Sequence, residues 1–366
     1  IEKQQYDKFT AEGKLILLDM AYKSDSLPYG VGINSMYFDF SPRYLQLTSY
    51  EGTVGGSDLM ASGRFDNYLA WWLQDSTLAG TFNVSSTLFD LNELMGPEDA
   101  AATTEAGTDT TPMSVIEVPR NIDFRLNADM KQVRYDDMDL HNCKGGLHVH
   151  DRRVDLDRLF FNLFNGAVTL SGAYETTDPK APTIDFSYDV KDLDIEQTVK
   201  YVETVQKMAP IAKTCKGSFS TNLKHMTATL GPDMMPLMNT LAGQGTLHTH
   251  NVRVDGFQPL VDLAKALKVK GIENTTLQNV DFSYEFKDGK MWTKPFDVKI
   301  DQVQANVGGS TAFADQSIDY DMKTKIPTKL FGNAANELVS GWLGQANKAL
   351  GAEFKVPEQI DATVKM

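Results

Sequence analysis

The chain has 366 residues, with 35 Lys and Arg against 49 Asp and Glu, which gives a net charge of −14. Because binding to a nucleic-acid backbone depends on clustered basic residues, this charge and the dispersed Lys and Arg argue against a nucleic-acid-binding protein. A hydrophobic content of 42% with 23% charged residues excludes disorder throughout, and no apolar stretch reaches the roughly 18 residues of a membrane span.

The N-terminal part of the chain, residues 1–95, is predicted to be a β module. Residues 96–118 follow with five acidic residues and no basic one among several Ala and Thr, a composition typical of a flexible loop. The first residue is Ile1, and no basic segment followed by an apolar one is visible near it. We therefore expect a processed piece of a longer protein, with any signal or membrane anchor upstream.

Residues 119–330 are dominated by strict alternation of apolar and polar side chains, the pattern of a strand with one buried and one wet face. The alternation is clearest at 184–190 and 280–286, and it returns more loosely at 122–130 and 318–325. The apolar residues of the two clearest segments are Ile184, Phe186, Tyr188, Val190, Val280, Phe282, Tyr284 and Phe286. Because the four segments share an Ile/Val-Asp-Phe/Tyr text, we expect an internal repeat.

Turn signals connect the predicted strands. Asn165-Gly166 and Asp288-Gly289 each lie between two strand-like segments, as in hairpins with two-residue turns. Neighbouring strands are therefore expected to be antiparallel.

Helical periodicity is limited to a few places. It predicts inserted helices at about 195–212 and 257–268, and residues 331–366 are expected to form a C-terminal amphipathic helix and a final strand. The predicted fold class is therefore mostly β: an elongated antiparallel sheet curved into a groove, built from repeats, with a few amphipathic helices.

A second repeat contains two pairs of histidines. Residues 145–155 (GGLHVHDRRVD) parallel residues 245–255 (GTLHTHNVRVD), so that the pair His148 and His150 corresponds to His248 and His250. Residues i and i+2 of a strand share a face and could both reach one metal ion. No third or fourth ligand has a recognisable spacing, however, so both pairs are interpreted as the polar faces of equivalent strands, and no metal is expected.

Signals of catalysis are absent from the sequence. It contains no nucleophile elbow, phosphate-binding loop, dinucleotide-binding glycine motif or zinc-protease helix. Carboxylates such as Asp155 and Asp157 fit the wet face of a strand. We therefore expect no catalytic residue, no cofactor and no enzymatic activity. The two cysteines, Cys143 and Cys215, either form one disulfide in an oxidising compartment or remain free thiols.

Glycine-containing strand text recurs along the chain. It reads YEGTVGGSDLMASGRFDNY at 50–68, LAGTFNVSS at 78–86, FDLN at 89–92, NGAVTLSGAY at 165–174 and NVGGSTAF at 306–313. This text resembles that of AsmA-family proteins, and the run from GQGTL (243–247) through FQPL (257–260) to a helix is similar to the C-terminal region of that family, which includes TamB-like relatives.

The resemblance implies a Gram-negative envelope protein that is anchored in the inner membrane by an upstream helix and projects a β-groove into the periplasm. In such proteins the apolar concave face carries the acyl chains of phospholipids or other lipids. The implied partners are acyl-chain lipids and envelope proteins, and the implied role is lipid transport in outer-membrane biogenesis or maintenance. This chain has too few repeats to span an envelope alone.

The strand pattern is compatible with that role. A large apolar face must be covered by helices, by a partner or by lipid. The main hypothesis is therefore a non-enzymatic lipid-binding module, with the eight alternating apolar residues of 184–190 and 280–286 as candidate lipid contacts. The alternative is an assembly module that acts through protein contacts, its apolar face covered by its own helices.

Overall fold

The computed structural model describes residues 11–24, 27–95, 115–202, 205, 209–267, 274–331 and 358–365. Within these ranges the chain forms 18 strands that belong to one hydrogen-bonded sheet, with only short helices. The predicted mostly β fold class is therefore confirmed. Most of the predicted acidic loop and the predicted C-terminal amphipathic helix lie outside the described residues.

The chain divides into two compact units. Unit 1 contains residues 1–189 and 225–237, and unit 2 contains residues 190–224 and 238–366. The boundary crosses the chain within β10 (Thr183–Asp194) and β11 (Cys215–Thr229). It therefore falls inside the region 119–330 and not at either end of the predicted acidic loop.

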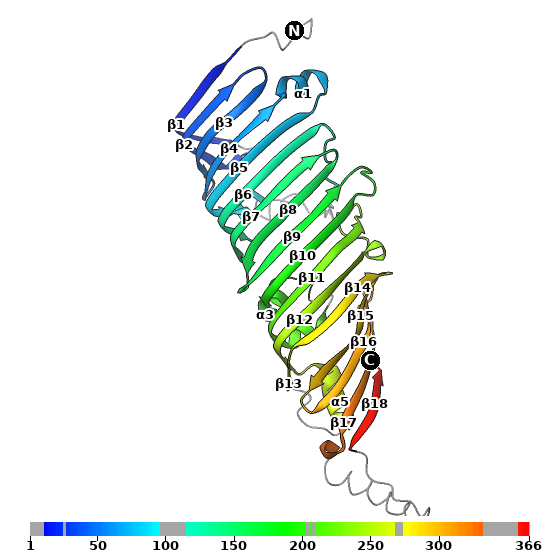
Figure 1. Cartoon of the computed structure of the whole chain (residues 1–366). Helices are drawn as coiled ribbons and strands as arrows, with labels where there is room; N and C mark the ends of the chain where they lie inside the picture. The colour runs from blue at the N-terminus through cyan, green and yellow to red at the C-terminus, as the bar shows by residue number, and fades with distance from the viewer. Residues whose placement is uncertain are drawn as a thin grey trace, which may run out of the picture. The chain divides into compact units, whose positions relative to one another are not determined.

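Besides parts of β10 and β11, unit 1 contains nine whole strands, which Figure 1 shows side by side in chain order. They are β1 (Gly13–Ser24), β2 (Leu27–Phe40), β3 (Tyr44–Val54), β4 (Ser57–Asp66), β5 (Leu78–Asp90), β6 (Ile122–Tyr135), β7 (Met138–His150), β8 (Arg153–Leu163) and β9 (Gly166–Glu175). Two short helices, α1 (Tyr68–Gln74) and α2 (Leu91–Met95), follow β4 and β5.

The strands of unit 1 are antiparallel with one exception. Each strand from β1 to β9 pairs with the next, but β5 and β6 pair in parallel, with Leu78 opposite Ile122 and Asp90 opposite Arg134. The prediction of antiparallel neighbours is wrong at this pair. A parallel partner requires the chain to cross back to the starting end of the strand, and residues 91–121 provide that connection.

The two predicted hairpin turns both exist, one of them shifted. Asp288 and Gly289 have φ angles of 53° and 70°, as the two central residues of a type I′ turn require. In the other hairpin the residues with positive φ are Phe164 at 47° and Asn165 at 64°, and Gly166 pairs with Leu163 as the first residue of β9. Asn165 thus takes the second turn position and not the first.

Unit 2 contains the C-terminal strands. They are β12 (Ala242–Asp255), β13 (Asn274–Leu277), β14 (Val280–Lys287), β15 (Lys290–Ile300), β16 (Val303–Ala312), β17 (Ile318–Pro327) and β18 (Gln359–Lys365). β12 pairs with both β13 and β14, and the strands from β14 to β18 pair in chain order, all antiparallel. The predicted final strand is β18.

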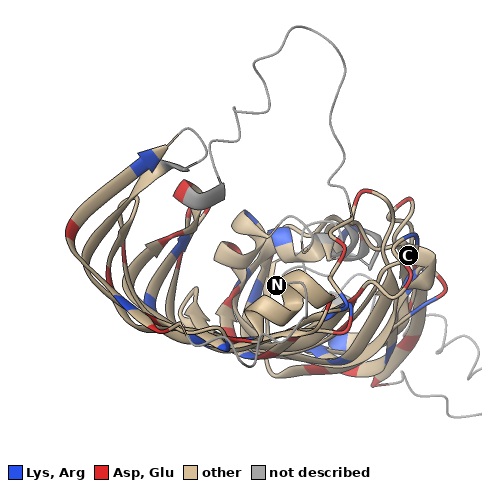
Figure 2. Ribbon diagram, turned by 90° about the horizontal axis from the view of Figure 1, so that it is seen from above, with Lys and Arg blue, Asp and Glu red and all other residues tan. Residues whose placement is uncertain are grey.

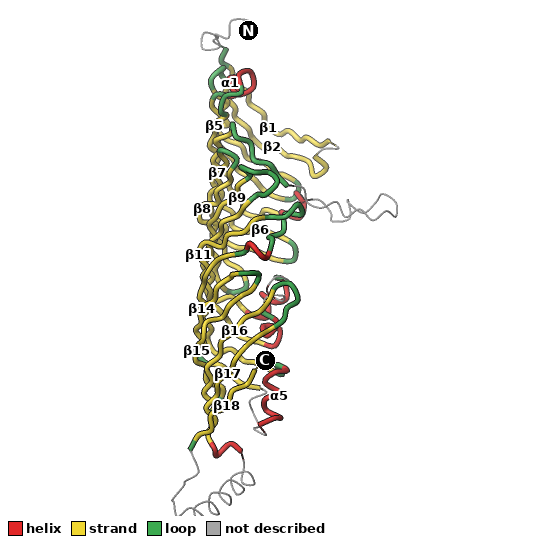
Figure 3. Tube along the Cα trace, turned by 90° about the vertical axis from the view of Figure 1, so that its right-hand side faces the viewer, coloured by secondary structure: helices red, strands yellow, loops and turns green. Residues whose placement is uncertain are grey.

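Helices cover part of one face of unit 2. The predicted helix at 257–268 is α5 (Gln258–Leu267), which Figure 3 shows beside β17 and β18. The predicted helix at 195–212 is shorter: α3 (Ile195–Tyr201) begins where the Asp194 side chain accepts a hydrogen bond from the Gln197 N–H at 2.8 Å, and a 3₁₀ turn occupies 210–214.

The core of unit 2 lies between these helices and the strands. Its buried members are Ile195, Val252, Val254, Ala264, Ile300, Val303, Ala305, Met322 and Ile326, from α3, α5 and strands β12, β15, β16 and β17. Half-buried residues including Val199, Phe257 and Ala362 pack against them. Unit 2 therefore closes its apolar face with its own helices.

Candidate functional site

One face of the sheet in unit 1 is apolar and carries a cluster of aromatic rings. The ring centroids of Phe65 and Phe82 lie 4.8 Å apart, and Phe124 lies 5.8 Å from the first and 5.6 Å from the second. In register, Phe82 is opposite Gly63 and Phe65 is opposite Gly80. Each ring lies across the neighbouring strand at a glycine, where a Cβ would meet it.

The alternation of faces is clearest in β6. Phe124, Leu126 and Ala128 are half-buried, whereas the intervening Asp123, Arg125, Asn127 and Asp129 are exposed. Leu126 is opposite Phe82 on β5 and Leu147 on β7, so the apolar face continues across these strands. The loosely alternating segment 122–130 is thus the strand that separates the two faces of unit 1 most sharply.

The apolar residues of unit 1 are much less buried than those of unit 2. Among the described residues, unit 1 contains 8 of the 23 buried hydrophobic residues but 14 of the 18 exposed large ones. Five of the exposed residues, Leu15, Ile16, Leu18, Met20 and Tyr22, lie on β1. Unit 1 therefore presents apolar side chains that the described part of the chain does not cover.

The candidate residues on β14 lie in a dry interior. Val280, Tyr284 and Phe286 are only 3–6% exposed, and Phe282 is half-buried with its ring 5.0 Å from that of Phe296. The Tyr284 hydroxyl also lies 3.0 Å from Thr221 Oγ1. The alternation predicts correctly which face of this strand is buried, but these side chains pack against protein.

On β10 the two faces of the strand do not differ in burial. Ile184, Phe186 and Tyr188 are half-buried, and so are the intervening Asp185 and Ser187. Phe186 lies across Gly172 of β9, in the same way as the aromatic rings of unit 1 described above. Val190 is half-buried in unit 2.

Sequence reasoning missed Phe65, Phe82 and Phe124 as members of an apolar face. The signal was present as Gly-x-Phe at 63–65 and 80–82. Two Gly-x-Phe segments on antiparallel neighbouring strands place each ring over the glycine of the partner strand. The ring then covers backbone that the glycine, which has no side chain, would leave open.

The opposite, polar face of unit 1 brings together the first histidine pair. His148 and His150 on β7 have ring centroids 4.1 Å apart. His148 Nε2 lies 2.7 Å from Asp123 Oδ1 on β6, and His150 Nε2 lies 2.7 Å from Asp155 Oδ2 on β8. Arg153 Nε donates to the other oxygen of Asp155 at 2.7 Å.

The charges of this cluster shift the pKa values of its members. The hydrogen bond to Asp155 raises the pKa of His150 against a smaller opposing effect of burial. Burial would raise the pKa of Asp155, but the hydrogen bonds from His150 and Arg153 together lower it. The pair therefore favours a protonated His150 beside an ionised Asp155.

The second histidine pair, on β12 in unit 2, has different surroundings. His248 Nε2 and His250 Nε2 lie 2.8 Å apart, His248 contacts Asp281, and His250 Nδ1 lies 3.2 Å from Asn279 Oδ1. Asp255, the counterpart of Asp155, pairs with Arg253 at 2.8 Å. The repeated sequence therefore does not form a repeated site.

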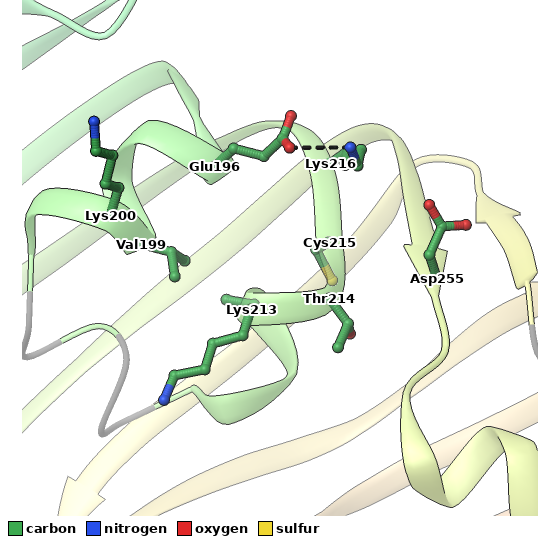
Figure 4. Close-up of a pocket in the computed structure, with 9 residues that line it drawn as sticks. Glu196, Val199, Lys200, Lys213, Thr214, Cys215, Lys216 and Asp255 are labelled. Carbon is green, nitrogen blue, oxygen red and sulfur yellow. Dashed lines mark ion pairs between the residues drawn. The ribbon is translucent and has the colours of Figure 1, made fainter.

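A shallow pocket of about 390 Å³ lies in unit 2 beside α3 (Figure 4). Its lining includes Lys200, Lys213 and Lys216, and Lys216 forms an ion pair with Glu196 at 3.2 Å. Burial raises the pKa of the lining Cys215 thiol to about 11, so this thiol is protonated at neutral pH and is a poor nucleophile. The residues that line this pocket offer no activated nucleophile.

The structure contains no disulfide between the two cysteines. Cys143 and Cys215 are both free thiols, and burial raises the pKa of Cys143 to about 11 as well. Figure 2 shows the positions of Lys and Arg interspersed with those of Asp and Glu along the ribbon of the strands.

Comparisons with known proteins found no relative. No family model matches the chain, and no significant match exists among curated proteins or solved structures. Among the described residues, no helix has the length and hydrophobicity needed to cross a membrane. The resemblance to AsmA-family proteins remains a prediction.

Proposed function

We propose that this chain is a non-enzymatic module that binds acyl-chain lipids on the apolar face of unit 1. The observation that carries the proposal is the unequal burial of the two units. Unit 2 covers its apolar residues with α3 and α5, whereas the aromatic cluster of unit 1 is only half-buried. Uncovered apolar surface of this extent is typical of sites for lipid or protein.

The resemblance to AsmA-family proteins extends the proposal to a role and a place. In that view the chain belongs to a periplasmic part of an inner-membrane-anchored protein and contributes to lipid transport for the outer membrane. An acyl chain needs a continuous apolar path, because an unpaired charge on that path is costly to desolvate. Between Asp123 and Asp129 the exposed polar residues of β6 lie on the opposite face from Phe124 and Leu126, as such a path requires.

The alternative is an assembly module that acts through protein contacts. The dry core of unit 2 favours it for that unit, since side chains such as Val254 and Ile326, both 0% exposed, leave no room for lipid. The two functions can therefore reside in different units of one chain.

Lipid extraction separates the two functions. The purified chain is extracted with organic solvent, and the extract is analysed by mass spectrometry. Lipid binding predicts co-purified phospholipid or another acyl-chain lipid in a fixed ratio to protein. Protein that carries none, and that takes up none from phospholipid vesicles, would favour the assembly module.

A matched pair of variants tests which face binds. Leu126→Asp places a carboxylate on the apolar face of β6, and Asn127→Asp places the same charge on the exposed polar face one residue later. We expect the first variant to lose most bound lipid while it remains folded by circular dichroism, and the second to retain lipid. Equal retention in two folded variants would exclude this face as the lipid site.

The positions chosen from the sequence give a less specific test. Phe186→Asp and Phe282→Asp, with Asp185→Lys as the charge control, would also reduce lipid transfer if these faces formed the path. Phe186 covers Gly172, however, and Phe282 stacks on Phe296, so both changes disturb packing as well. Leu126 is the better position, because its matched control lies on the same strand.

A further inference from the structure

The polar face of unit 1 brings Asp155 beside His148 and His150, as a third potential metal ligand that the sequence spacing does not reveal. One ligand atom each from His148, His150 and Asp155 lies within 4.8 Å of the other two. The three residues come from the two strands of one hairpin, β7 and β8, and all are half-buried. We propose that His148, His150 and Asp155 bind a divalent transition-metal ion such as Zn²⁺.

The turn between the strands produces this arrangement. Asp151 and Arg152 have φ angles of 42° and 63°, so the chain reverses directly after His150. The register then places Asp155 opposite His148 and Arg153 opposite His150. Because residues of one face recur every second position, His148, His150 and Asp155 all project to the same side of the hairpin.

The chemistry of the ligands fits a transition metal. Two imidazoles and one carboxylate are a common protein set for Zn²⁺, which binds them at about 2.0–2.2 Å in a tetrahedral arrangement and leaves one position for water. Tetrahedral ligands at that distance lie about 3.3 Å apart. Binding therefore requires His150 Nε2 and Asp155 Oδ2 to move apart slightly from 2.7 Å, within the freedom of side chains at a strand end.

Neighbouring groups hold the ligands in place. Asp123 holds the His148 ring through Nε2 at 2.7 Å, and Arg153 donates to Asp155 Oδ1, which leaves Oδ2 directed at His150. Such outer partners orient ligands and increase metal affinity. Asp151 adds a third carboxylate at 3.4 Å from His150 Nδ1, while the nearby cations are Arg153 and Arg125, the residue opposite His148 on β6.

The second histidine pair provides a built-in control. β12 continues without a hairpin from His248 and His250 to Asp255. Asp281 contacts His248, but among the described residues no third His, Cys, Asp or Glu places a ligand atom within 4.8 Å of both histidines. Asp255 keeps an ion pair with Arg253 like the one between Asp155 and Arg153. Replacing Asp255 therefore reproduces the loss of an Arg–Asp pair without affecting the proposed site.

The test measures Zn²⁺ binding to the whole 366-residue chain after removal of metal by a chelator. Equilibrium dialysis with elemental analysis should give one tightly bound Zn²⁺ per chain. We expect Asp155→Asn and His150→Gln each to weaken binding at least about tenfold, and Asp255→Asn and the double change His248→Gln/His250→Gln to leave it unchanged. Circular dichroism confirms that each variant is folded.

A second readout does not depend on any variant. Co²⁺ in a four-coordinate site with nitrogen and oxygen ligands gives a visible absorption band, which added Zn²⁺ should abolish at one equivalent. Absence of tight Zn²⁺ binding by the wild-type chain would overturn the proposal. So would an equal loss in Asp155→Asn and Asp255→Asn, or a loss that follows His248 and His250. None of these results bears on lipid binding, which concerns the opposite face.

Discussion

A single residue decides whether the repeated sequence turns or continues. Asp151 and Asn251 both have positive φ, at 42° and 46°, and the next residue is Arg152 in the first copy and Val252 in the second. Arg152 also adopts positive φ and completes a hairpin, whereas Val252 remains in β12 and is 4% exposed in the core of unit 2. β-branched side chains strongly disfavour positive φ, so Val252 continues the strand.

Replacing Arg152 should therefore expose this dependence. Arg152→Val is expected to destabilise the hairpin by about 1–2 kcal/mol, because a β-branched residue is strained at a φ of 63°. Arg152→Gly, which removes the same side chain without strain, should be neutral or stabilising. Chemical denaturation measures the stability of both variants. An equal loss of stability in the two would mean that removal of the Arg152 side chain, and not backbone strain, causes the destabilisation.

A second residue, Asp58, binds the backbone of the neighbouring strand β5. Asp58 at the start of β4 accepts hydrogen bonds from the backbone N–H groups of Thr87 and Leu88, each at 2.8 Å, and from the Ser86 hydroxyl at 3.2 Å. Burial acts to raise the pKa of Asp58, but these hydrogen bonds together lower it. The carboxylate is thus bound more tightly as an anion than as an acid.

The stability supplied by Asp58 should depend on pH with a defined sign. The pKa of Asp58 is lower in the folded chain than in the unfolded chain, where it is about 4. The contribution of Asp58 to stability is therefore fully present above about pH 4, and it is lost as the pH falls through the folded pKa. Asp58→Asn should cost about 1 kcal/mol at neutral pH, and less in acid, in denaturation experiments. If Asp58→Asn lowered the free energy of unfolding more in acid than at neutral pH, the prediction would be contradicted.

At the scale of strands, glycine and aromatic residues face each other repeatedly. The pairs in register are Gly13 with Phe40, Gly63 with Phe82, Gly80 with Phe65, Gly245 with Tyr284, and Gly309 with Tyr320. In each pair a Cβ on the glycine would meet the aromatic side chain. These pairs fix the register of neighbouring strands, because a shift by one residue would move the ring to the other face.

The pair Gly63 and Phe82 allows a double-mutant test. Gly63→Val should destabilise unit 1 by about 1–3 kcal/mol, because the added side chain overlaps the Phe82 ring. Combined with Phe82→Ala, the same change should cost less than in the wild-type background. Strictly additive effects in chemical denaturation would show that the two residues do not interact.

The sequence predicts the strands better than their connections. Alternation identifies β6, β10, β14 and β17 because period two is a local property of the chain. It does not reveal the parallel pairing of β5 with β6 or the contact of Asp155 with His150, because both depend on how distant segments are placed. The apolar face was expected on β10 and β14, yet the β14 side chains are covered, by residues distant in sequence such as Thr221 and Phe296.

For the molecule as a whole, the two units should differ in stability. Unit 2 contains most of the buried hydrophobic residues, so opening it exposes more apolar surface and costs more free energy. Native-state hydrogen exchange should show the strongest protection in β15, β16 and β17, and weak protection in β1. Uniform protection of both units would contradict this prediction, because it would mean that they unfold together. If unit 1 binds lipid, added lipid should increase protection in unit 1 only.

The parallel pairing of β5 with β6 also has a consequence for the order of folding. Within unit 1, the strands from β1 to β5 and those from β6 to β9 follow one another through connections of at most 11 residues, whereas 31 residues separate β5 from β6. Closing a longer loop costs more chain entropy, and a non-local pairing is rewarded only after that closure. The hairpins on either side should therefore form first and the β5–β6 ladder last, as a late kinetic phase in pulse-labelled refolding.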